Sequence, residues 1–217
     1  MKILIAGASG FLGSYITKAF PDAILVSRTK KVGYITYDEL PKSVDLIIHA
    51  AGESLFGLPT KAKFERMAHS RASVLVKLSQ VNAKHIVCFS GIDVLPKGKI
   101  TSQTKPSLNS PVSIVETELL NINPAISIIR LGIIQAEGSA ISKLPFALVP
   151  NAQTYYTDVS DIISYLKKGS FEKYHNIVTK KVTYKKLFQK NGVFVLSFPR
   201  LFVPTYLKAF VWDREID

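Results

Sequence analysis

The sequence contains very little cysteine. Its single thiol, Cys88, lies in an apolar run and has no second cysteine in the 217 residues with which to form a disulfide. Small proteins of oxidising compartments use cysteine much more heavily. The scarcity of cysteine therefore favours a reducing, cytoplasmic location.

Long hydrophobic runs are also missing. Residues 1–6 are too short an apolar stretch to be the hydrophobic region of a signal peptide. Residues 193–212 are mostly apolar, but two prolines and two cations argue against a spanning helix: Pro199, Arg200, Pro204 and Lys208. A segment lying on a membrane surface is an alternative. We favour packing of 193–212 over a substrate cleft, and membrane contact is not expected.

Acidic residues are few compared with basic ones. There are 28 Lys and Arg against 16 Asp and Glu, a formal charge of +12, which suggests an anionic partner. The excess is spread evenly, with 14 basic against 7 acidic residues in 1–100 and 14 against 9 in 101–217. No run of five or six like charges occurs, so no nucleic-acid-binding arm is predicted. A solvated basic surface that attracts an anionic small-molecule substrate is the favoured interpretation.

The composition is that of one globular domain, since 47% of the residues are apolar and glycine and proline are ordinary in number. Short apolar segments typical of buried strands alternate with segments of helical periodicity. The predicted strands are 2–6, 23–26, 34–37, 45–52, 85–90, 125–131, 174–179 and 193–196, and the predicted helices are 11–20, 61–80, 114–120, 158–168 and 182–189. This alternation predicts an α/β fold with a doubly wound parallel sheet.

Three glycines follow the first predicted strand at intervals of three, namely Gly7, Gly10 and Gly13. The first would permit a tight turn, the second a close approach of backbone to a pyrophosphate, and the third close packing of the helix. The amino end of the helix would direct its N–H groups at the phosphates. The pattern predicts a dinucleotide site formed by Gly7, Ser9, Gly10, Phe11, Leu12 and Gly13.

The residue after the second predicted strand bears on the choice of cofactor. NAD-binding sites usually have an acidic side chain there, which accepts a hydrogen bond from the ribose 2′-hydroxyl. This sequence has Arg28 instead, followed closely by Lys30 and Lys31. A cation suits a 2′-phosphate, so NADP is predicted in preference to NAD.

The glycine turn and three later segments (45–51, 129–132 and 156–161) together resemble the short-chain dehydrogenase/reductase superfamily. More narrowly, the chain is similar to the extended and atypical branches that include NAD(P)-dependent sugar-nucleotide epimerases and dehydratases. Residues 51–54 with Ser70 and Arg71 resemble one subgroup of epimerase-like proteins. The resemblance implies a Rossmann domain over 1–217, with cofactor contacts also from Ala50, Ala51 and Gly52. It implies a reduced substrate-binding part at about 133–157 and 174–217.

The family's acid/base pair is missing. The resemblance places the catalytic Tyr at Ser110 and the Lys at Ile114, and residues 91–135 contain no tyrosine. A tyrosine needs a neighbouring cation to lower its pKa before it can act as a base, so the usual proton relay cannot operate. The strand-end hydroxyl of the family falls at Ile92, although Ser90 is retained.

Several residues are weighed as substitutes. Asp93 and Ser90 are the catalytic candidates, with a turn-capping role as the alternative for Asp93. His49 is given a structural role, and Tyr155 or Tyr156 would have to reach the site from a loop. The four histidines show no metal-ligand spacing. The sequence thus predicts either an oxidoreductase or epimerase with a non-standard site or an inactive dinucleotide-binding sensor or scaffold, and it leaves a homodimer open.

Overall fold

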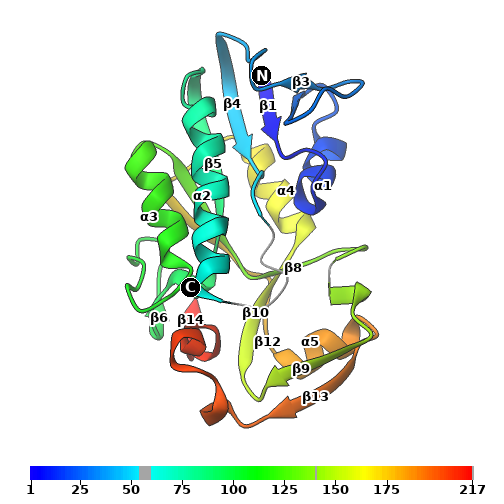
Figure 1. Ribbon diagram of the computed structural model, residues 1–217, viewed down its shortest axis with the longest axis vertical. Coiled ribbons are helices and arrows are strands. Elements are labelled where there is room, and N and C mark those ends of the chain that lie inside the picture. The colour runs from blue at the N-terminus through cyan, green and yellow to red at the C-terminus, as the bar shows by residue number, and fades with distance from the viewer. Residues whose placement is uncertain (54–59, 140, 217) are drawn as a thin grey trace. The chain divides into compact units, whose positions relative to one another are not determined.

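The structure, a computed structural model, describes residues 1–53, 60–139 and 141–216 (Figure 1). The chain divides into two compact units. The first unit consists of Met1–Ser90, Ile114–Ile129 and Lys167–His175, and the second of Gly91–Ser113, Arg130–Leu166 and Asn176–Asp217. The first unit contains every residue predicted to contact the cofactor.

The main sheet has seven strands in the described part of the chain, in the order β11-β7-β5-β4-β1-β2-β3. Their bounds are β1 Ile3–Ala6, β2 Ile24–Ser27, β3 Ile35–Thr36, β4 Ser43–His49, β5 Asn82–Gly91, β7 Ser127–Leu131 and β11 Tyr174–Ile177. The pairs from β5 across to β3 are all parallel. All four residues of β1 are buried, as expected for a strand with helices over both faces.

Three helices follow strands of this sheet: α1 (Phe11–Ala19), α2 (Lys61–Leu78) and α3 (Ser113–Ile122). The chain steps from β1 to β2 in one direction and from β4 to β5 in the other. Because such crossovers are right-handed, α1 and α2 cover opposite faces of the sheet. Helices α2 and α3 lie side by side, where Asn123 Nδ2 just after α3 donates a 3.4 Å hydrogen bond to Ser79 Oγ (Figure 1).

The second unit is built from short strands. These are β6 (Gly98–Ile100) with β14 (Arg214–Ile216), β9 (Phe146–Pro150) with β13 (Phe194–Phe198), and β8 (Ile133–Gln135), β10 (Gln153–Asp158) and β12 (Lys180–Thr183). Helix α5 (Tyr184–Lys190) contributes Tyr184 and Leu187 to a core that also contains Val149 and Val195. The remaining elements are α4 (Val159–Lys168) and the 3₁₀ turns η1 Ile92–Val94, η2 Ile141–Lys143, η3 Arg200–Phe202 and η4 Thr205–Val211.

The α/β class and the mostly parallel sheet predicted from the sequence are confirmed. Two local predictions are wrong. Residues 182 and 183 belong to strand β12, and α5 begins only at Tyr184 because Thr183 Oγ1 caps it by accepting from Lys186 N at 3.2 Å. Tyr155 and Tyr156 lie in strand β10, not in a loop. No helix in the described ranges has the length and apolar character needed to cross a membrane.

Candidate functional site

The site begins where β1 and β4 end side by side. Strand order reverses between these two strands, and ligands of open α/β sheets bind at such a switch point, beyond the carboxyl ends of the strands. Gly7 leaves β1 with a φ of +85°, and a Cβ there would lie 2.5 Å from Ala51 N. The two strand ends therefore touch through backbone, and only glycine fits at position 7.

The turn from Gly7 to Gly13 presents a backbone cradle. Gly10 N donates to Gly7 O at 2.9 Å, and a Cβ on Gly13 would collide with the Gly7 carbonyl. Ser9 and Gly10 are exposed, and Leu12 is half-buried. Gly7 and Gly13 thus meet the steric demands predicted for them, and the approach of a pyrophosphate to Gly10 stays a prediction.

The amino end of α1 suits an anion. The first amides of a helix have no acceptor within the helix, and in α1 no side chain caps them. No acidic residue lies in the first turn to compensate the positive end of the dipole. Together with the glycine cradle, these free amides fit the pyrophosphate of a dinucleotide.

Arg28 lies directly after β2 and is exposed. Its guanidinium makes no hydrogen bond or ion pair with any described residue. Burial raises the pKa of the Tyr37 phenol, and the positive charge of Arg28 partly offsets that shift. Arg28 is therefore available to an external anion on the side of the sheet where β2 ends.

The second edge of the cradle, 50–53, is tied to helix α2. Ala50 N donates to Ala6 O at 2.9 Å, and Glu53 N donates to Ser70 Oγ at 2.8 Å. Arg71 Nη1 donates to Glu53 O at 3.1 Å, and Lys63 Nζ lies 2.7 Å from the Glu53 carboxylate. The two halves of the subgroup motif noted in the sequence are thus in contact, apart from Ser54, which lies outside the described residues.

His49 closes β4 and is 3% exposed. Its Nε2 is 3.0 Å from the carbonyl of Arg71, so Nε2 carries the proton and donates it. Burial lowers the pKa of His49 to about 4, and the ring is neutral near pH 7. This bond to the backbone of α2 supports the structural role predicted for His49.

Two polar atoms near the ends of β4 and β5 lack partners. His49 Nδ1 and Ser90 Oγ are buried and make no hydrogen bond with any described residue. Buried polar groups are nearly always satisfied, by protein, water or ligand. Such orphaned atoms at the carboxyl edge of the sheet agree with a polar ligand there, and they fit the assignment of Ser90 to the site.

Asp93, the other catalytic candidate, belongs to the second unit. Its side chain is 16% exposed and lies 3.5 Å from Arg214 Nη1. Burial raises the pKa of Asp93 to about 6, against the opposing effect of Arg214. Asp93 is therefore a carboxyl group that can hold a proton at mildly acid pH, but an arginine already pairs with it.

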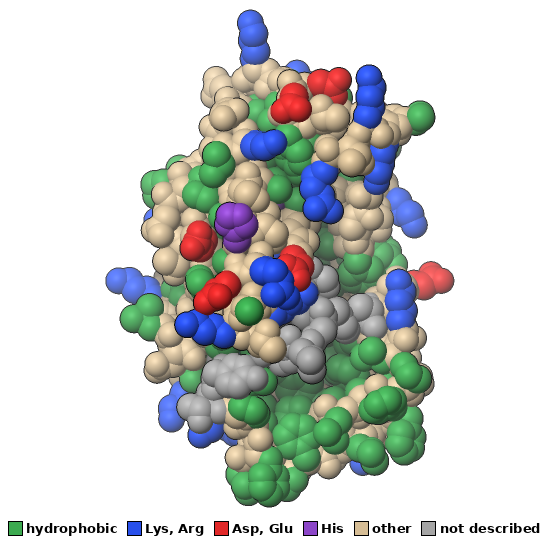
Figure 2. Space-filling view, in the orientation of Figure 1, with side chains coloured by type: hydrophobic (Ala, Val, Ile, Leu, Met, Phe, Trp, Pro, Cys, Tyr) green, Lys and Arg blue, Asp and Glu red, His purple; other side chains and the backbone are tan. Residues whose placement is uncertain are grey.

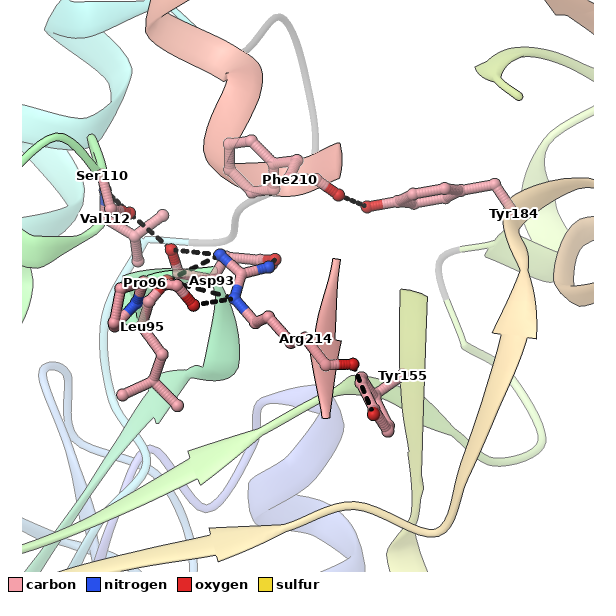
Figure 3. A network of polar contacts seen from close by, with 9 residues as sticks. All are labelled: Asp93, Leu95, Pro96, Ser110, Val112, Tyr155, Tyr184, Phe210 and Arg214. Carbon is pink, nitrogen blue, oxygen red and sulfur yellow. Dashed lines mark hydrogen bonds and ion pairs between the residues drawn. The ribbon is translucent and has the colours of Figure 1, made fainter. Parts of the chain in front are cut away.

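Arg214 is the centre of the polar network in Figure 3. Its Nε and Nη2 donate to Leu95 O at 3.1 and 2.8 Å, and Nε also reaches Pro96 O at 3.2 Å. Ser110 Oγ donates to Asp93 O at 2.6 Å. Ser110 thus occupies the position that the family resemblance gives to the catalytic Tyr. Its buried hydroxyl is hydrogen-bonded to the loop that contains Asp93.

Two tyrosines of this unit donate to backbone carbonyls, and one of these carbonyls is that of Arg214. Tyr155 OH donates to Arg214 O at 3.0 Å, and Lys181 Nζ donates to the same oxygen at 2.7 Å. Tyr184 OH donates to Phe210 O at 2.8 Å, and burial raises its pKa far above the ordinary value. The pKa of Tyr184 is shifted away from the depressed value that a tyrosine base requires, and the Tyr155 hydroxyl is engaged with a backbone carbonyl. Sequence inspection missed Arg214, because one arginine near the end of an apolar segment gives no signal.

No group of histidine, cysteine or carboxylate side chains in the described ranges could hold a metal ion. Among the described residues, the candidate site offers backbone amides, the Arg28 guanidinium and two buried polar atoms that lack hydrogen-bond partners there.

No protein-family model matches the chain, and no curated protein matches it. Solved structures do. The human epimerase family protein SDR39U1, solved with NADPH, superposes with a TM-score of 0.77 at 16% identity over 100% of this chain and 90% of that one. MoeE5, solved with UDP-glucuronic acid and NAD, gives a TM-score of 0.71 at 16% identity over 100% and 90%.

A dTDP-4-dehydrorhamnose reductase from Clostridium acetobutylicum gives a TM-score of 0.67 at 16% identity over 99% of this chain and 89% of that one. Identities this low establish the architecture and leave the chemistry to the site. The chain has the Rossmann-type α/β fold of these solved structures.

Proposed function

We propose that this chain is an NADP-binding protein of the short-chain dehydrogenase/reductase type, resembling epimerases, dehydratases and reductases of sugar nucleotides. The observation that carries the proposal is the glycine cradle against Ala50 and Ala51 with the uncapped amino end of α1 above it. A turn with this backbone contact and these free amides suits a pyrophosphate. The scarcity of cysteine, with Cys88 free, is in keeping with the proposed cytoplasmic location.

In this proposal Gly7, Ser9, Gly10, Phe11, Leu12 and Gly13 hold the pyrophosphate, and Ala50, Ala51 and Gly52 line the opposite side. Arg28 would bind the 2′-phosphate that distinguishes NADP from NAD, since its guanidinium is exposed and pairs with no described residue. A bound nicotinamide would supply hydride. Residues 133–157 and 174–217, most of which fall in the second unit, would bind an anionic, nucleotide-linked substrate.

A second candidate function is favoured by the Ser110 contact. The positions of the missing pair hold Ser110 and Ile114, and the Ser110 hydroxyl is committed to Asp93 O. The nearby carboxylate of Asp93 is itself paired with Arg214. A chain without a free acid or base would bind the dinucleotide without turning it over, as a sensor or scaffold.

The two candidates share one binding experiment. Titration calorimetry with NADPH and NADH should show tighter binding of NADPH, and Arg28→Ala should weaken NADPH at least tenfold while changing NADH little. Lys2→Ala, an exposed cation at the opposite end of β1, is the matched control and should change neither. Equal affinity of the wild type for both nucleotides would contradict the NADP assignment.

Assays of substrate turnover distinguish the enzyme from the sensor or scaffold. Loss of NADPH absorbance in the presence of dTDP-linked or UDP-linked keto sugars would identify a reductase. Conversion of a sugar nucleotide in the presence of NADP, without net formation of NADPH, would identify an epimerase if the product is an isomer and a dehydratase if the product has lost water. Tight NADPH binding with no conversion of any such substrate would favour the sensor or scaffold. Failure to bind either nucleotide would reject both.

A further inference from the structure

The outer face of the β9–β13 sheet is strongly apolar. Phe146 and Leu148 on β9 are each 63% exposed, and Phe194 and Leu196 on β13 are 66% and 55% exposed. The strands are parallel, and their register pairs Phe194 with Phe146 and Leu196 with Leu148. These four side chains form one continuous patch, called the apolar face below.

The apolar face is not part of the core. Along both strands the alternate residues Ala147, Val149 and Val195 are buried in the cluster that includes helix α5. The sheet is therefore already covered on its inner side. The large apolar residues in register on the outer side stay more than half exposed when this unit folds, and such a patch is typical of an interaction site.

The exposed apolar surface continues along the chain after β13. Leu201 and Phe202, in the turn that follows, are 75% and 66% exposed. Figure 2 shows hydrophobic side chains gathered along the lower right of the view, where Figure 1 draws β9 and β13.

The charges on the same segments are all of one sign. Residues 138–157 and 176–212 contain no acidic residue and eight cations, which are Lys143, Lys180, Lys181, Lys185, Lys186, Lys190, Arg200 and Lys208. Lys143 precedes β9, Lys190 precedes β13 and Arg200 follows β13, so cations border the face at the ends of its strands. Of these three, Arg200 is ion-paired with Asp213 at 2.8 Å, and Lys190 Nζ lies 5.6 Å from the centre of the Tyr156 ring. The exposed side chain of Lys143 is the remaining cation at this end of the face.

An exposed apolar face bordered by cations favours one kind of binding partner. A second copy of the chain would bring the same cations together, and like charges would oppose the contact. An anionic lipid bilayer accepts aromatic and leucine side chains at its boundary and attracts the bordering lysines. Contrary to the expectation from the sequence, and because these four side chains are exposed, we propose that the β9–β13 face docks this protein on an anionic phospholipid surface. The contact is peripheral, and it does not depend on the proposed dinucleotide function.

The proposal can be tested by flotation with vesicles of phosphatidylcholine and phosphatidylserine in equal parts, compared with pure phosphatidylcholine. The full chain should float with the anionic vesicles, and less so as salt is raised. The double substitution Leu148→Gln with Leu196→Gln should reduce the bound fraction at constant lipid at least tenfold. Leu108→Gln with Val32→Gln, which changes two equally apolar residues that are 93% and 101% exposed elsewhere, should leave flotation unchanged.

The substituted residues are exposed, so thermal unfolding of both double variants should match the wild type, and NADPH titration should be unchanged. Lys143→Gln with Lys190→Gln should weaken binding to anionic vesicles and reduce its salt dependence.

Four results would overturn the proposal: no flotation of the wild type, equal flotation on pure phosphatidylcholine, equal flotation of the face variant, or a concentration-dependent dimer lost in the face variant without any vesicle binding. The last result would assign the face to a second copy.

Discussion

The guanidinium of Arg214 lies 3.5 Å from Asp93 Oδ1, with 4% of the arginine side chain exposed. The contact joins the turn after β5 to strand β14, across 121 positions of sequence. Its donors also hold the carbonyls of Leu95 and Pro96 (Figure 3). Arg214 Nη2 also lies 3.4 Å from Asp93 O, so a single side chain holds three carbonyls of this loop and links them to strand β14.

Loss of this side chain should be costly. Arg214→Met removes the partner of a largely buried carboxylate and leaves the loop carbonyls without donors, which typically costs about 3–5 kcal/mol. Urea unfolding would measure this change. Arg200→Met, which breaks the exposed pair with Asp213, should cost about 0.5 kcal/mol or less and serves as the matched control. Similar losses for the two variants would show that the Arg214 network does not stabilise the fold.

Titration of Asp93 should make the free energy of unfolding fall as pH rises. Its pKa is about 6 in the folded protein and about 4 when unfolded, so between these values the folded state binds the extra proton. Stability from this group is present below pH 4 and is lost as pH rises to about 6, by up to about 3 kcal/mol. Relative to Asp93→Asn, the wild type should therefore lose stability across this window. Asp213→Asn, an exposed carboxylate whose pKa is lowered, should change nothing there.

Titration of His49 should have the opposite effect, and make the free energy of unfolding rise with pH. Its pKa falls to about 4 in the folded protein from about 6.5 in the unfolded chain, so the unfolded state binds more protons between these values. Stability from this group is present above pH 6.5 and is lost on acidification to pH 4, by up to about 3 kcal/mol. Urea unfolding of His49→Gln should show a shallower acid loss than the wild type. The double variant with Asp93→Asn should lack both contributions, and a double variant that keeps either slope would contradict the assignment.

The elements predicted correctly from the sequence have strong local signals. Strand β4 has four consecutive buried residues, as its unbroken apolar run predicts. Helix α2 buries Phe64, Met67 and Leu75 on one side, as the spacing of its apolar residues predicts. The short strands had no such signal. Strand β6 pairs with β14 through Gly98 and Arg214, and three residues are too few to show a period. These pairings depend on contacts between distant parts of the chain.

The same contrast holds for the site. The glycine turn was predictable, because a strand–turn–helix unit needs residues without a side chain where the turn is tight and where the helix packs closely. The partner of Asp93 was not, since the pair is set by tertiary packing alone. The outward direction of Phe194 was also unpredictable, because Val193 to Leu196 is uniformly apolar and only the pairing with β9 decides which residues face out.

Gly7 offers the sharpest test of the cradle. Gly7 and Gly33 share a positive φ, +85° and +78°, but a Cβ on Gly33 would meet nothing within 4 Å, whereas one on Gly7 would lie 2.5 Å from Ala51 N. Gly33→Ala should therefore cost only the strain of that backbone conformation, about 1 kcal/mol.

Gly7→Ala adds a collision with the backbone that follows β4, so urea unfolding should show a loss of about 3 kcal/mol. NADPH affinity should fall at least tenfold in this variant and stay unchanged in Gly33→Ala. If the two variants lose the same stability, the ends of β1 and β4 do not approach as closely as described, and the cradle would lose its physical basis.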